Sequence, residues 1–373
     1  MSDSQLAAAD VLRLRLVHQR LTAPGDDPAE LVAHLGAVQS QDYPAACWAL
    51  GLRLRQPRAT AAEAIEAAFG AGAIVRTHVL RPTWHFVAPA DIRWMLGLTG
   101  ARIRASGAAY TRGLGLSEPL LERCSAVIGE ALRGGHSRTR AELGGFLREA
   151  GVIEPDGARL GCILLHAELE ALVCSGPRRG KQHTYMLLDE RVPAVPPMDR
   201  DAALAALTWR YFNSHGPALV QDCVWWSGLS GSEIKRGLEA NAARLRCAAI
   251  DGREYWLSCA ATPVPEAASA MLLPNYDEYT VAYRERDLYY DRAANATGDA
   301  RMDVPFRHVL LVDGQVRGRW SVTQRAGAAR IDVEWSIAPT AAQAKAIERT
   351  ADDYAEFLGL ACEVGATGHL ESL

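Results

Sequence analysis

The sequence predicts an α+β protein with three tandem winged-helix motifs and a C-terminal β-rich subdomain. One pattern, helices with N-terminal cap signals followed by a short hairpin-like segment, occurs three times before residue 260. Beyond that point, strand-like segments and one amphipathic helix replace it. The length of 373 residues is sufficient for two or three domains of ordinary size.

The first winged helix is predicted over residues 1–115. Helix signals begin near Asp10 and again after Asp27, which precedes a proline at the first helical position and a glutamate three residues on. A third helix is predicted to open at Thr60, which has a glutamate at the same spacing. Residues 74–87, IVRTHVLRPTWHFV, have the β-branched and aromatic content of a hairpin, with a proline near its turn.

The second winged helix is predicted over residues 116–192. Helices are expected over roughly 119–133 and 159–172. A capping box, Thr139-Arg140-Ala141-Glu142, opens another helix between them. The alternating segment 172–189 then supplies the hairpin of this copy.

The third winged helix is predicted over residues 193–260, after the linker candidate PAVPPM (193–198). It has a helix over 199–216, a capping box at 230–233 and a hairpin over 247–258 that turns at Asp-Gly. Its helix-turn-helix contains Trp225 and Trp226. These rings are candidates for base stacking, but adjacent residues of a helix usually place at least one ring in the core, and we favour the core.

The C-terminal subdomain is predicted over residues 261–373. Strands are expected over 272–283, 308–322 and 329–337, and a helix over 340–358. The first of these strands contains two adjacent carboxylates, Asp277 and Glu278, which would face opposite sides of a strand. A structural or positioning role is therefore expected for them rather than paired acid and base catalysis.

Composition excludes several classes of protein. The N-terminus lacks a basic region followed by an apolar run, and no stretch of eighteen apolar residues occurs, so we expect a cytoplasmic protein. Eight cysteines without a CxxC pair indicate reduced thiols and no structural zinc. His78 and His85 lack companion ligands at metal-binding spacing, and no common nucleotide-binding or hydrolase motif is present. We therefore expect neither a metal nor a cofactor.

Two short segments are strongly basic although the whole chain has a formal charge of −4. Residues 133–140, RGGHSRTR, and 176–183, GPRRGKQH, each hold three permanent positive charges and no acid. The second segment lies at the tip of a predicted hairpin, where charges extend from a fold. The alternative is an ordinary solvated surface. The DNA-contact candidates are Arg178, Arg179, Lys181, Arg138 and Arg140.

The segment LVAHLGAVQSQDYP contains a pair of glutamines, Gln39 and Gln41. As a helix, it would place these amides on opposite flanks of the apolar stripe. Taken alone, they are helix-end amides that bond nearby backbone. On a continuing helix the two side chains diverge, so they could bond one common water molecule only if the helix loosens at this point. Pro44 favours such a break, because it disfavours helix continuation from Tyr43.

These features together resemble the AlkZ-like family of bacterial winged-helix DNA glycosylases, in its branch with a Gln-x-Gln catalytic motif. The similarity extends over nearly the whole chain, and its recurring segments are 76–87, 165–193, 211–229 and 272–283. The family motif has an aliphatic residue between the glutamines, whereas this chain has Ser40. Gln41, where another branch has aspartate, places the chain closer to the self-resistance type.

The resemblance implies removal of N7-alkylated, cationic purines from double-stranded DNA by a water molecule that Gln39 and Gln41 position, without a cofactor. The substrates would include bulky natural-product adducts and interstrand crosslinks. Thr83, Trp84 and His85 of the first hairpin would enter the groove that carries the lesion. A base flipped from the helix and a base attacked in place are both compatible with the motif.

Two other functions fit the same pattern. A winged-helix transcriptional regulator without catalysis would bind one preferred sequence, usually as a symmetric dimer. Three winged helices in one chain already form an extended surface, which favours a monomer. A nucleic-acid scaffold that has lost its activity would bind DNA without releasing any base.

Overall fold

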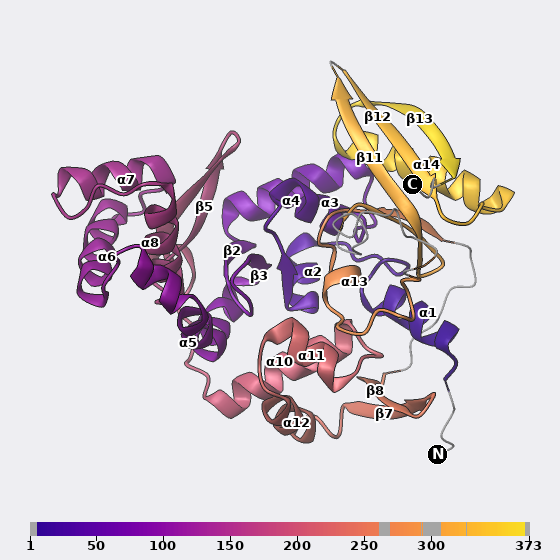
Figure 1. Ribbon diagram of the computed structural model, residues 1–373, viewed down its shortest axis with the longest axis horizontal. Helices are drawn as coiled ribbons and strands as arrows, with labels where there is room; N and C mark the ends of the chain where they lie inside the picture. The colour runs from indigo at the N-terminus through magenta and orange to yellow at the C-terminus, as the bar shows by residue number, and fades with distance from the viewer. Residues whose placement is uncertain (1–5, 261–268, 292, 294–306, 326, 370–373) are drawn as a thin grey trace.

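The computed structural model describes residues 6–260, 269–291, 293, 307–325 and 327–369. Figure 1 shows three regions around a centre: helices α6 to α8 with β5 at one end, helices α10 to α12 below, and the sheet of β11 to β13 with α14 at the upper right. The expected α+β class is confirmed, with a C-terminal sheet of five strands. None of the described helices is long and apolar enough to cross a membrane.

The first region follows the predicted order, with three additional elements: β1, α3 and α5. Asp27 caps the second helix, because its carboxylate accepts the backbone N–H groups of Ala29 and Glu30 at 2.8 Å. The helix expected to open at Thr60 starts two residues earlier, at Arg58, with Pro57 at its N-cap. A 25-residue helix, α5, follows the hairpin where the sequence analysis assigned no element. The elements are α1 (Ala8–His18), α2 (Pro28–Leu35), β1 (Ala37–Gln39), α3 (Tyr43–Gly51), α4 (Arg58–Ala71), β2 (Val75–His78), β3 (Trp84–Val87) and α5 (Pro89–Gly113).

The second region has the predicted capping box. Thr139 Oγ1 accepts the N–H of Glu142 at 3.3 Å, and the Glu142 carboxylate accepts the N–H of Thr139 at 2.6 Å. The hairpin pairs with a short third strand, in the order β4-β6-β5. The elements are α6 (Glu118–Leu132), β4 (Arg138–Thr139), α7 (Arg140–Glu149), α8 (Gly157–Leu169), β5 (Val173–Arg179), β6 (Gln182–Leu187) and α9 (Leu188–Arg191).

The third region contains the predicted helix-turn-helix and hairpin. Gly228, with φ of 72°, ends the first helix of that pair, and Ser230 caps the second. Trp226 is fully buried while Trp225 is 41% exposed, so the prediction that at least one ring enters the core is confirmed. The elements are α10 (Arg200–Ser214), α11 (Val220–Ser227), α12 (Gly231–Ala240), β7 (Leu245–Ile250) and β8 (Arg253–Ser258).

The C-terminal region differs from the sequence prediction at one important place. The strand expected over 272–283 ends at Leu273, and Asp277 instead caps a short helix by accepting the N–H of Tyr279 at 2.8 Å. The sheet has the order β13-β12-β11-β10-β9, with β13 parallel to β12 after a crossover through α14. The elements are β9 (Ala270–Leu273), α13 (Glu278–Val281), β10 (Val309–Val312), β11 (Gln315–Arg325), β12 (Ala328–Trp335), α14 (Ala341–Phe357) and β13 (Ala361–His369).

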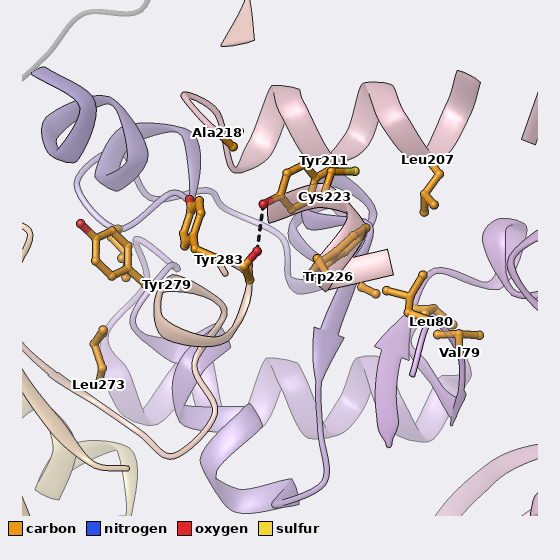
Figure 2. Packing of buried hydrophobic residues seen from close by; sticks show 14 of the residues in the cluster. Val79, Leu80, Leu207, Tyr211, Ala218, Cys223, Trp226, Leu273, Tyr279 and Tyr283 are labelled. Atoms are coloured by element: carbon orange, nitrogen blue, oxygen red, sulfur yellow. Dashed lines mark hydrogen bonds between the residues drawn. The ribbon is translucent and has the colours of Figure 1, made fainter. Parts of the chain in front are cut away.

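The largest hydrophobic core combines residues from the first, third and C-terminal regions with a few from the second, such as Cys174 and Leu188. Most of the second region has a core of its own. Figure 2 shows Trp226 beside Tyr211 in the large core, and the Tyr211 hydroxyl donates to the Ala282 carbonyl at 2.8 Å. A third cluster, built from α2, α3 and α4, lies against the sheet of β1, β3 and β2. This small sheet therefore separates two cores, and its first strand ends at Gln39.

Candidate active site

The sequence predicted that Gln39 and Gln41 lie at the end of a helix, and this prediction is wrong. Helix α2 ends at Leu35, because Gly36 adopts a φ of 84° that side-chain-bearing residues rarely take. Gln39 is the last residue of β1, and Gln41 lies exposed in the bend that follows. Pro44, predicted to stop a helix, lies in the first turn of α3, where its missing N–H costs nothing.

The strand places Gln39 directly opposite His85 of β3, and His85 opposite Thr77 of β2. Ser40 N–H donates to the Trp84 carbonyl at 2.7 Å, which makes Gln39 and His85 a pair without mutual backbone hydrogen bonds. The side chains of such pairs lie close together on one face. Gln39, His85 and Thr77 thus form a row of buried polar side chains on the face toward the large core.

Glu278 occupies the open edge of β1. In this register the Gln39 N–H points away from β3, and Glu278 Oε1 accepts it at 2.8 Å. Trp226 Nε1 donates to Oε2 at 3.0 Å, and His215 Nε2 lies 3.5 Å from the same oxygen, at the outer limit of a hydrogen bond. Burial opposes ionisation of Glu278, but His215 and the Gln39 N–H outweigh it and hold its pKa below the ordinary value.

His85 presents a free lone pair to this cluster. Burial, with the charge of Arg81, lowers the pKa of His85 to about 3, so the imidazole is neutral near pH 7. Its Nδ1 lies 2.8 Å from the Thr83 carbonyl, which only accepts, so Nδ1 carries the proton. Nε2 is then an acceptor, and it has no partner among the residues that the structure describes.

Arg81 lies on the other side of the glutamine. Its Nη2 donates to Gln39 Oε1 at a long 3.4 Å, and its Nε is buried without a partner in the described part of the chain. Burial lowers the pKa of this guanidinium, although the charge of Glu278 opposes the shift. Arg81 therefore has spare donors next to Gln39.

The chemistry available to this cluster is positioning rather than proton transfer. Both oxygens of Glu278 already accept hydrogen bonds, and an amide does not titrate near neutrality. The chain has only three lysines, which lie at Lys181 in a hairpin turn, Lys235 on α12 and Lys345 on α14. The cluster thus contains the Gln39 amide and a neutral imidazole that can orient water, and no amine nucleophile.

The other residues proposed for the lesion groove lie nearby. Trp84 projects to the opposite face of the sheet from His85, where its Nε1 donates to Glu168 Oε1 at 3.4 Å and its ring lies 4.4 Å from the Arg76 guanidinium. Thr83 is in the loop between β2 and β3, and its N–H donates to the Arg81 carbonyl at 2.7 Å. His85 is fully buried in this structure.

The two basic segments meet on the second region. Strand β4 pairs with β6 through Arg138 and Tyr185, and Arg179 donates to the Ser137 carbonyl, which brings both segments to one surface. Lys181 is exposed in the hairpin turn. The remaining four candidates have partners within the protein. Arg178 pairs with Glu66 and Arg179 with Glu142, each at 2.9 Å, while Arg138 Nε donates to the Ala131 carbonyl at 3.4 Å and Arg140 donates to the Gly157 carbonyl. Their contact with DNA stays a prediction.

The sequence patterns did not predict Glu278 and Arg81 beside Gln39, or His215 beside Glu278. Residues 275–279 were assigned to a strand, although Asp277 is a good N-cap residue and offered the signal for a short helix. No local sequence pattern could predict the contact between Glu278 and Gln39, because the two residues are 239 positions apart in the sequence.

A buried ion pair fixes the helix that carries Glu278. Both Arg53 Nη atoms donate to the Asp277 carboxylate, at 2.7 and 2.8 Å. We expect Asp277→Ala to lower the free energy of unfolding by about 3–5 kcal/mol, because it leaves a buried guanidinium without its counter-charge. Urea unfolding measures this. Asp353→Ala, which removes the partly exposed pair with Arg58, is the control and should cost about 1 kcal/mol or less. Equal losses would contradict the expectation.

Buried histidines make the stability depend on pH. Burial lowers the pKa of His34 to about 4, and its Nε2 contacts the His18 carbonyl at 2.7 Å. Because the unfolded chain binds this proton first, near pH 6.5, the stabilisation is complete above that pH and is lost as the pH falls toward 4. We expect His34→Gln to reduce the slope of unfolding free energy against pH in this window by up to about 1.4 kcal/mol per unit. Urea titrations at several pH values test this, and an unchanged slope would contradict it.

Comparison with known proteins agrees with this architecture. The profile of the AlkZ-like DNA glycosylase family matches residues 32–357. Among solved structures, the DNA glycosylase AlkZ of Streptomyces sahachiroi is similar with a TM-score of 0.76 and 20% identity, over 98% of this chain and 100% of that one. At this identity the similarity establishes the fold. No curated protein sequence matches the chain. Since the family profile spans most of its length, the chain belongs to the AlkZ-like DNA glycosylase family.

Proposed function

We propose that this DNA glycosylase hydrolyses the N-glycosidic bond of N7-alkylated purines in double-stranded DNA, with a water molecule positioned by Gln39 and Gln41. Its substrates would include bulky natural-product adducts and interstrand crosslinks. The protein would act as a monofunctional enzyme and as a monomer.

The observation that carries the proposal is that strand β1 extends to Gln39 and that Ser40 continues its pairing with β3 through the hydrogen bond to the Trp84 carbonyl. Residues i and i+2 of a strand lie on one face, whereas in a helix they diverge. Gln39 ends β1 and Gln41 follows two residues later, outside any helix. This favours the two amides meeting on one side, where both can bond the same water.

The surroundings of Gln39 support a cationic substrate. A base alkylated at N7 is already charged and leaves as a neutral purine, so no strong general acid is required. The cluster provides none that is free, because Glu278 is ionised and bonded on both oxygens while His85 is neutral. The absence of a lysine from this cluster supports hydrolysis by water alone rather than a Schiff-base mechanism.

A base-release assay tests the proposed function. Single-turnover incubation with a duplex that carries N7-methylguanine, and then with a duplex that carries a natural-product crosslink, should yield abasic sites. The Gln39→Ala/Gln41→Ala variant is the control and should yield almost none. Binding without release from every alkylated duplex would instead favour a regulator or an inactive scaffold.

A further inference from the structure

A cavity of about 440 Å³ borders the Gln39 cluster, between helix α5, helix α11 and the loop that joins β2 to β3. Arg81 lines this cavity and also donates to Gln39 Oε1. Arg81 therefore links the cavity to the glutamine, and a ligand in the cavity would lie one residue away from the proposed reaction centre.

The cavity is strongly basic. Arg81, Arg102 and Arg284 line it, and its lining includes no carboxylate. In the described ranges none of these three guanidinium groups forms an ion pair, unlike Arg178 and Arg179 of the β5–β6 hairpin. Three positive charges without a paired carboxylate favour an anionic ligand and repel a cation.

Two of these arginines have distinctive local surroundings. A Cβ at Gly228 would collide with the Arg102 guanidinium and lie 2.9 Å from the Leu80 carbonyl oxygen, so this glycine lets Arg102 pack against the end of α11. Arg81 has a buried Nε that no described residue satisfies. A buried donor without a partner is costly, and a ligand oxygen would relieve that cost.

One wall of the cavity is aromatic. The Trp225 ring is 41% exposed and is fixed by a hydrogen bond from Nε1 to the Val281 carbonyl at 3.0 Å. Arginines beside an exposed, fixed indole match a ligand that alternates phosphate with an apolar ring, as a nucleic-acid strand does.

We propose that this cavity binds the phosphodiester backbone of the damaged strand beside the lesion, with Arg102 and Arg284 as phosphate ligands and Trp225 against the adjacent sugar. The assignment rests on the proposed function, since the lesion itself is placed at Gln39. It excludes the alkylated base as occupant, because three arginines repel a cationic purine. The lesion base then lies on the other side of Arg81.

A neutral-phosphate scan tests the assignment. A series of duplexes is made, each with a stable tetrahydrofuran abasic analogue at the lesion position. In each duplex a different phosphate near that position is replaced by one uncharged methylphosphonate, and affinity for the protein is measured. In the parent protein, one or two adjacent positions should weaken binding about tenfold, since each loses a charged hydrogen bond. In Arg102→Ala/Arg284→Ala, affinity for the unmodified duplex should fall about tenfold or more, and the same methylphosphonates should have no further effect.

Salt dependence gives a second readout. The slope of log affinity against log salt should become shallower by about two in Arg102→Ala/Arg284→Ala and by about one in Arg284→Ala, whose exposed side chain is not needed for folding. Arg349→Ala on α14 removes an equivalent exposed charge away from the cavity and should change neither readout. The assignment would be overturned if the same methylphosphonates still weakened binding of the Arg102→Ala/Arg284→Ala variant. It would also be overturned if no methylphosphonate position weakened binding of the parent protein.

These binding measurements require no bond cleavage. If the parent releases N7-methylguanine and the scan is unchanged by the arginine substitutions, only the phosphate site is wrong. If it releases no alkylated base, the proposed function fails whatever the scan shows.

Discussion

Replacing Gln41 by alanine is expected to slow the release of N7-methylguanine from duplex DNA by about 100-fold, while affinity for the duplex stays nearly the same. Removal of one preorganised polar group from a reaction centre typically costs about 100- to 1000-fold in rate, and a 100-fold loss corresponds to about 2.7 kcal/mol of transition-state stabilisation. Gln41 is exposed in a bend, and the structure shows no hydrogen bond from its side chain to the described residues. The substitution should therefore leave the fold intact.

Single-turnover kinetics separate the two effects, because saturating enzyme removes differences in binding from the measured rate. Gln56→Ala is the matched control: it removes a glutamine whose Nε2 bonds the Asp26 carbonyl, outside the site, and its rate should equal that of the parent. Equal rates for Gln41→Ala and the parent would remove Gln41 from the mechanism.

Glu278→Gln is expected to lower the same rate by about 10- to 100-fold through a displaced Gln39. The carboxylate accepts two N–H groups, from Gln39 and from Trp226, and lies close to His215. An amide has one oxygen, so its NH2 must face one of these donors and leave that donor unsatisfied or moved. Glu278 touches no substrate in this scheme and acts as a positioning residue.

A double-mutant cycle distinguishes positioning from a general loss of stability. If Glu278 acts through Gln39, Glu278→Gln should cost almost nothing further in a Gln39→Ala background. Urea unfolding establishes that each variant is folded under the assay conditions, and affinity for a tetrahydrofuran duplex should stay within a factor of about two, since the substitution leaves the surface charges in place. Fully additive rate losses would show that Glu278 acts independently of the glutamine.

Local signals in the sequence account for much of the fold. The capping residues Asp27, Thr139 and Ser230 all open helices as expected, because a side-chain oxygen at the N-cap satisfies N–H groups that the helix leaves free. The hairpin turn at Asp251-Gly252 is also confirmed, since both residues adopt the positive φ that such turns require.

Predictions failed where a local pattern admits two structures. Residues 31–41 have the apolar spacing of a helix, but Gly36 ends that helix and the chain continues as a strand. A proline interrupts a helix when it lies in the interior and is well tolerated in the first turn, and the sequence alone does not distinguish these positions. Pro44 lies in the first turn of α3. Glu278 of α13 contacts Gln39, and Trp226 of α11 and His215 after α10 lie around Glu278. Only the packed core brings these distant segments to β1.

Ser40 lies between the two glutamines, yet it belongs to a different environment. It is fully buried, its N–H and carbonyl bond Trp84 and Arg76, and its hydroxyl has no partner among the described residues. Strand alternation turns its side chain away from Gln39, toward the packed helices α2 to α4. A buried position without hydrogen-bond partners suits a small aliphatic side chain as well as serine. The residue between the two glutamines therefore packs in the interior of the protein, so a change at this position would act on the packing against α2 to α4.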